Sequence, residues 1–85
     1  MTDEKTRQRV TALLSSGVRR ALEAHQVATL NPQGARDVAK LALLSLRRAA
    51  EESQYLETLE ERQASGIISG PLAATLRASF GYDLD

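Results

Sequence analysis

The chain contains no cysteine, which excludes several ways of stabilising a small domain. Disulfides and thiolate metal sites cannot form, and with His25 as the only histidine no histidine-rich metal site can be built within one chain. Eighty-five residues suffice for one domain, whose stability is marginal unless a disulfide, a metal or self-association adds to it. Of these three additions, self-association is the one that the composition leaves open.

Long apolar runs and aromatic residues are also scarce. The longest uninterrupted apolar run is Leu41–Leu44, far below the roughly 20 residues that span a bilayer. The first ten residues mix both charge signs and lack the apolar stretch of a secretion signal, so we expect a soluble, cytoplasmic protein without a membrane partner. Tryptophan is absent and alanine and leucine are abundant, which favours packed helices over a sheet.

Only two prolines occur, and each follows a residue that can begin a helix. Asn31 can cap free backbone N–H groups while Pro32 fits the first helical turn, and Ser69 or Gly70 with Pro71 repeats this signal. We therefore expect helices over about 3–25, 32–64 and 70–80 within a single domain, 1–85. The second helix could extend to residue 64 because no glycine or proline stops it between Ala35 and Ser65, and a break near Ser53 is the alternative.

Apolar residues cover a wider arc of the second expected helix than of the first or third. Single apolar stripes run along the first and third helices, formed by Val10, Leu13, Leu14, Gly17, Val18 and Ala21 and by Leu72, Leu76 and Phe80. On a helical wheel Leu43 and Leu44 point off opposite edges of the second helix. We predict an all-α fold, a small three-helix bundle with a central and possibly long second helix. Its two edges are covered by the other helices, or by one helix and a second subunit.

Residues able to perform catalysis are few and scattered. His25 falls in the last turn of the first helix, where a partly cationic side chain suits the helix dipole, and no nucleophile or pocket accompanies it. Glu57 and Glu61 lie one turn apart, but no Glu-x-x-His motif occurs and both point away from the apolar stripe. We expect no enzyme activity, no catalytic residue, no bound metal and no cofactor.

Binding of another protein is the function that the sequence favours. We predict a small accessory, adaptor or regulatory module that binds a protein partner and forms a homodimer. The candidate surface consists of Leu43, Leu44, Tyr55, Leu59, Phe80 and Tyr82. Gly17 and Ala21 form a small pair that indicates a close helix crossing, either with Ala42 and Ala49 of the same chain or with a second chain.

The zero net charge conceals two halves of opposite sign. Residues 1–50 hold nine basic and four acidic residues, and residues 51–85 hold two basic and seven acidic ones. The simplest interpretation is that the halves fold together and largely cancel. The alternative function is a nucleic-acid-binding regulator, whose basic face would displace counterions from phosphates. That face would consist of Lys5, Arg9, Arg19, Arg20, Arg36, Lys40 and Arg47.

Overall fold

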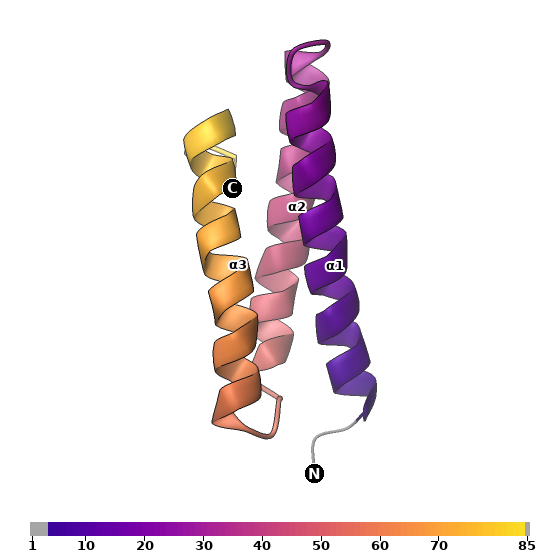
Figure 1. Ribbon diagram of the computed structural model, residues 1–85, viewed down its shortest axis with the longest axis vertical. Helices are drawn as coiled ribbons and strands as arrows, with labels where there is room; N and C mark the ends of the chain where they lie inside the picture. Colours follow the sequence, from indigo (N-terminus) through magenta and orange to yellow (C-terminus); the bar gives the residue numbers. More distant parts are fainter. Residues whose placement is uncertain (1–3, 85) are drawn as a thin grey trace.

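The computed structural model describes residues 4–84 and contains three helices, α1 (Glu4–Val27), α2 (Pro32–Ser53) and α3 (Leu59–Phe80). α2 runs antiparallel to the other two helices (Figure 1). It packs against both of them, whereas α1 and α3 make little contact with each other. The all-α three-helix bundle and the central place of α2 are therefore confirmed. None of the helices within 4–84 is long and apolar enough to pass through a bilayer.

α1 and α2 pack closely because small residues line their contact. Gly17 lies at this crossing, where an added Cβ would stand 2.7 Å from Leu46 Cδ2 and 3.5 Å from the Ala42 carbonyl oxygen. The crossing expected at Gly17 is thus formed within the chain, with Leu46 rather than Ala49 as the nearest neighbour. The buried stripe of α2 that faces this contact consists of Ala35, Ala39, Ala42, Leu46 and Ala49.

The second helix begins at Pro32 as predicted, but it ends before residue 64. Asn31 Oδ1 accepts a hydrogen bond of 3.0 Å from the Gly34 N–H, and Pro32 occupies the first turn. A continuous helix to residue 64 is wrong, because α2 ends at Ser53. The chain turns there through backbone bonds of 3.0 Å from Tyr55 N to Glu52 O and from Leu56 N to Ser53 O.

The third helix starts at Leu59 rather than near residue 70. A capping box begins it: Thr58 Oγ1 accepts from the Glu61 N–H at 3.1 Å, and the Glu61 carboxylate accepts from the Thr58 N–H at 3.4 Å. Gly66 and Pro71, which the sequence suggested as a helix stop and a helix start, both lie inside α3. The expected first residue of α1, Asp3, lies outside the described residues.

A buried serine contact joins the end of α2 to the start of α3. Ser53 Oγ lies 2.6 Å from Ser65 Oγ and also donates to the Ala49 carbonyl oxygen. One turn later, Ser69 Oγ donates to the Ser65 carbonyl oxygen at 2.9 Å. These contacts satisfy the hydroxyl groups inside the core, so that polar residues can occupy the α2–α3 interface.

The C-terminal tail packs back onto the bundle. Gly81 adopts a positive φ of 115°, and beyond it Leu84 is buried in the core cluster. The Arg36 guanidinium donates to the Phe80 carbonyl oxygen and, at 3.1 Å, to the Asp83 carboxylate. This guanidinium holds the pKa of Asp83 below its usual value of 3.8, chiefly through the hydrogen bond.

Candidate protein-binding surfaces

The six residues of the predicted partner surface do not lie together. Leu43 is only 5% exposed and belongs to the core, because α3 and the tail cover that edge of α2. The expectation that Leu43 faces a partner is therefore wrong, whereas its neighbour Leu44, which lines a depression beside Leu43, is 41% exposed. The other four residues lie at opposite ends of α3: Tyr55 and Leu59 near its start, and Phe80 and Tyr82 near its end.

Phe80 takes part in a contact with the only histidine of the chain. The rings of His25 and Phe80 lie 5.0 Å apart between centroids, tilted by 46°. His25 occupies the last turn of α1, as predicted. The contact therefore joins the C-terminal ends of α1 and α3, and half-buries Phe80 rather than presenting it to a partner.

The predicted basic patch is divided between two flanks of α2. Arg9 of α1 forms an ion pair of 3.3 Å with Glu52, whereas Arg36 pairs with Asp83 beside the end of α3. Lys5 and Arg20 share the side of α1 that holds Arg9, with Arg19 further round. Lys40 and Arg47 instead line a depression with Leu84, on the α3 side of α2. These residues therefore form no single basic face.

α3 contains a long uncharged stretch, which was not expected because the sequence pattern placed residues 65–69 between two helices. Between Arg62 and Arg77 no residue of this helix is charged, yet only Ser65, Ser69 and Leu76 are buried there. Ile67 is 72% exposed and Ile68 is 44% exposed. A helix without charge around its circumference is usually covered on most sides, so α3 exposes a surface suited to a partner. The Thr58–Glu61 capping pattern is the signal that could have placed this stretch in a helix.

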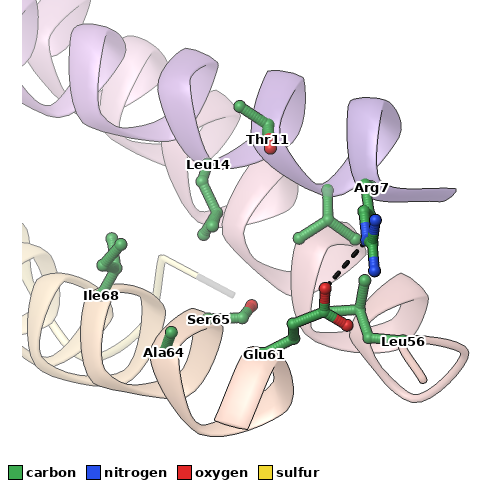
Figure 2. A pocket seen from close by; sticks show the side chains of 9 residues that line it. Arg7, Thr11, Leu14, Leu56, Glu61, Ala64, Ser65 and Ile68 are labelled. Atoms are coloured by element: carbon green, nitrogen blue, oxygen red, sulfur yellow. Dashed lines mark ion pairs between the residues drawn. The ribbon is translucent and has the colours of Figure 1, made fainter. Parts of the chain in front are cut away.

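One such surface lies between the parallel helices α1 and α3, in a cleft of about 270 Å³. Figure 2 shows Leu14 and Ile68 extending into the cleft from its two walls, with Ala64 and Ser65 along the α3 side. The Arg7 guanidinium and the Glu61 carboxylate form an ion pair of 2.8 Å across one end. Toward the other end the α1 wall continues with exposed apolar side chains. The α1–α3 face is defined here as Leu14, Val18, Leu22, Ala64 and Ile68.

A second surface follows the opposite side of α3, where this helix packs on α2. Three depressions of about 200, 210 and 250 Å³ adjoin there, because neighbouring ones share Leu43 and Arg47 or Ala50 and Ser69. Among the described residues that line them, none is acidic. The α2–α3 groove is defined here by a floor of small residues and a basic rim. The floor includes Ala50, Gly66, Gly70 and Ala73, and the rim consists of Lys40, Arg47, Arg62 and Arg77.

The described part of the chain contains no cluster of side chains suited to bind a metal ion. Histidine and acidic side chains within 4–84 form no group of three that could hold an ion. Comparison with protein-family models, curated proteins and solved structures finds no significant match to this chain. Function is therefore inferred from the two surfaces of α3 themselves.

Proposed function

We propose that this protein is a small non-enzymatic interaction module that acts by binding other protein chains, beginning with a second copy of itself. The uncharged stretch of α3 between Arg62 and Arg77 is the observation that supports this. α2 covers one side of the stretch and α1 touches it only slightly, which leaves Ile67 and Ile68 exposed. Burying such residues against another apolar surface is favourable by roughly 25 cal/mol per Å².

The size of the α1–α3 face agrees with a dimer interface. Between Arg7 and His25, α1 rises about 27 Å, and two adjacent helices are about 20 Å wide, giving roughly 500 Å² in projection. The accessible surface of protruding side chains exceeds this projected area. Stable interfaces bury about 800 Å² per partner, so this face covers most of that requirement.

The helix dipoles favour a second copy in antiparallel orientation. α1 and α3 run parallel (Figure 1), so the positive N-terminal ends of both helices lie at one end of the α1–α3 face and their negative C-terminal ends lie at the other. A twofold axis near Ile68 places the N-terminal ends of one copy against the C-terminal ends of the other. A parallel arrangement would bring like ends of the dipoles together.

Sedimentation velocity or light scattering of the purified protein at high micromolar concentration tests this proposal. We expect a dimer that Ile68→Glu converts to a monomer while helicity, measured by circular dichroism, is unchanged. Leu30→Glu is the matched control, because Leu30 is 86% exposed in the α1–α2 turn, outside the α1–α3 face. A monomeric unmodified protein, or equal loss of the dimer in both variants, would reject self-association through this face.

A further inference from the structure

We propose that the edge of α2 beneath the C-terminal tail is a docking site for a short acidic segment of a partner protein, and that the tail is its internal competitor. The tail is defined here as residues 81–84, and the tail site as Arg36, Lys40 and Leu43 of α2. This inference rests on the proposed interaction function, but not on self-association through the α1–α3 face. The tail is an occupant already in place, and it indicates the chemistry of other occupants.

The tail site holds the tail through one carboxylate and one leucine. The Arg36 guanidinium donates to the Asp83 carboxylate at 3.1 Å, and Leu84 is buried in the core cluster that contains Leu43. The Arg36 hydrogen bond lowers the pKa of Asp83, and the positive charge of Lys40 adds to this lowering, so both cations act on the carboxylate. An acidic residue followed directly by an apolar one is therefore the pattern that this site binds.

Few other contacts hold the tail in place. The Asp83 side chain is 78% exposed, so water screens its ion pair, and Tyr82 is 79% exposed. Leu84 is thus the one side chain that the tail buries deeply among its described residues. Segments outside a helix with so few buried contacts open locally at a low cost in free energy. Another chain with the same pattern can therefore compete with the tail.

The tail also leaves part of the site unfilled. A depression of about 200 Å³ lies beside Leu84, and its lining includes Lys40, Leu43 and Leu44 of α2. An apolar side chain larger than leucine would bury more of this surface, and the gain in free energy is proportional to the apolar area removed from water. We therefore expect the partner segment to carry a large apolar residue, such as phenylalanine, directly after its acidic residue.

The covalent link gives the tail an advantage over a free peptide. Gly81 joins the tail to α3, and its positive φ of 115° and the close approach of Arg36, 2.9 Å from an added Cβ, both require glycine there. A segment on so short a connection competes at an effective concentration of about millimolar. A weak peptide should therefore bind well only after the tail is released.

The experiment titrates two full-length, ¹⁵N-labelled proteins, unmodified and Leu84→Ser, with the acetylated synthetic peptide Phe-Gly-Tyr-Asp-Leu-Asp, which repeats residues 80–85. We expect Leu84→Ser to bind the peptide about tenfold or more tightly than the unmodified protein, with shifts of the Lys40 and Leu43 amide signals. The Gly66 amide signal should remain in place, because it lies about 21 Å along α3 from the end of this helix.

A second released variant leaves the core intact. Asp83→Asn retains Leu84 and removes the charge that Arg36 holds, so it should increase peptide binding by a smaller factor than Leu84→Ser does. Tyr82→Ser is the matched control, because it changes an exposed residue of the same tail and should bind the peptide like the unmodified protein. Equal binding by all four proteins, or no shift in either released variant at millimolar peptide, would overturn the proposal.

Altered peptides test the chemistry of the occupant. Lysine in place of the first aspartate should weaken binding to Leu84→Ser about tenfold or more, because it faces two cations. Phenylalanine in place of leucine should strengthen binding, because the ring fills the depression. Equally tight binding of the lysine peptide would overturn the role of Arg36 and Lys40, and a phenylalanine peptide that binds no more tightly would overturn the expected large apolar residue. Tighter binding of a DNA or RNA oligonucleotide to the same residues would overturn the proposal as a whole.

Failure of self-association can be distinguished from failure of the tail site. Ile68→Glu should abolish the dimer and leave peptide binding unchanged. If the protein is monomeric and the released variants bind the peptide, self-association is rejected and the tail-site proposal stands. If the dimer forms and no variant binds the peptide, the tail-site proposal alone is rejected. Loss of the dimer in Leu84→Ser but not in Ile68→Glu would overturn both, because the tail of a second copy would then be the occupant.

Discussion

Gly17 of α1 faces Leu46 of α2 so closely that a Cβ on residue 17 would stand 2.7 Å from Leu46 Cδ2 and 2.9 Å from Cγ. Leu46 is itself almost completely buried, and therefore has little room to move aside. A mid-helix glycine costs α1 about 1 kcal/mol relative to alanine. Close approach of the two helices offsets this cost, since it brings the small buried residues of α2 into van der Waals contact.

Replacing Gly17 by leucine should therefore destabilise the fold. Overpacking of this kind costs about 1–3 kcal/mol, because neighbouring side chains and the backbone must shift. Urea denaturation followed by circular dichroism measures the change. Gly66→Ala is the contrasting variant: nothing lies within 4 Å of its added methyl group, so it should stabilise α3 by about 1 kcal/mol. A Gly17→Leu protein as stable as the original would show that α1 and α2 do not meet at this residue.

Pro71 is a second residue whose replacement tests the structure. It lies inside α3, where it cannot donate to the Ile67 carbonyl oxygen and its ring crowds that group. Pro71→Ala should restore the bond and raise the free energy of unfolding, by up to about 3 kcal/mol. Thermal denaturation provides the measurement. If residue 71 instead began a helix, as the sequence suggested, the same substitution would have little effect or would destabilise.

The two prolines show why the fold class could be predicted and the third helix could not. Both Pro32 and Pro71 follow a residue able to cap a helix, but Asn31 accepts from the Gly34 N–H, whereas Ser69 donates backward to the Ser65 carbonyl oxygen. The second geometry belongs to a helix that continues. Tertiary packing of Ser65 and Leu76 against α2 selects it, and a local signal does not contain that information.

The binding surfaces were predicted less well for the same reason. The sequence pattern placed residues 65–69 between two helices and so excluded Ile67 and Ile68, which are exposed on α3. The basic residues can be read directly from the sequence, but the ion pairs of Arg9 with Glu52 and of Arg36 with Asp83, on different flanks of α2, cannot. Those pairings join residues more than forty positions apart, and no local pattern indicates them.

The buried pair Ser53 and Ser65 provides a test of how α2 and α3 are joined. Since Ser53 donates to the Ala49 carbonyl oxygen, the Ser65 hydroxyl is the donor in the 2.6 Å contact between them. Ser53→Ala leaves the Ser65 hydroxyl without this acceptor and should cost about 1–3 kcal/mol. In a double-mutant cycle the pair should show a coupling of about 1 kcal/mol. Additive effects of Ser53→Ala and Ser65→Ala would mean that the two hydroxyls do not interact.

Acid should loosen the C-terminal tail through Asp83. The Arg36 hydrogen bond lowers the pKa of Asp83 in the folded state, so its stabilising effect is complete above the usual carboxyl pKa of 3.8. That effect is lost as the pH falls through the lowered folded-state value. At neutral pH Asp83→Asn should therefore be less stable than the unmodified protein, and the difference should vanish in strong acid. In an Arg36→Gln background, Asp83→Asn should have a smaller effect at neutral pH, because only the backbone hydrogen bond and Lys40 still stabilise the carboxylate; an undiminished effect would contradict the pairing.

The neighbours Leu43 and Leu44 give the sharpest test of which edge of α2 the chain covers itself. Leu43 packs in the core cluster with Leu46, Leu76 and Leu84, so Leu43→Ala should cost about 2–5 kcal/mol through lost burial and a cavity. Leu44 is 41% exposed, and Leu44→Ala should change stability by about 0.5 kcal/mol or less in the isolated chain. Chemical denaturation at low micromolar concentration compares the two variants without a contribution from a dimer. Equal losses would contradict the burial of Leu43 by α3 and the tail while Leu44 stays exposed.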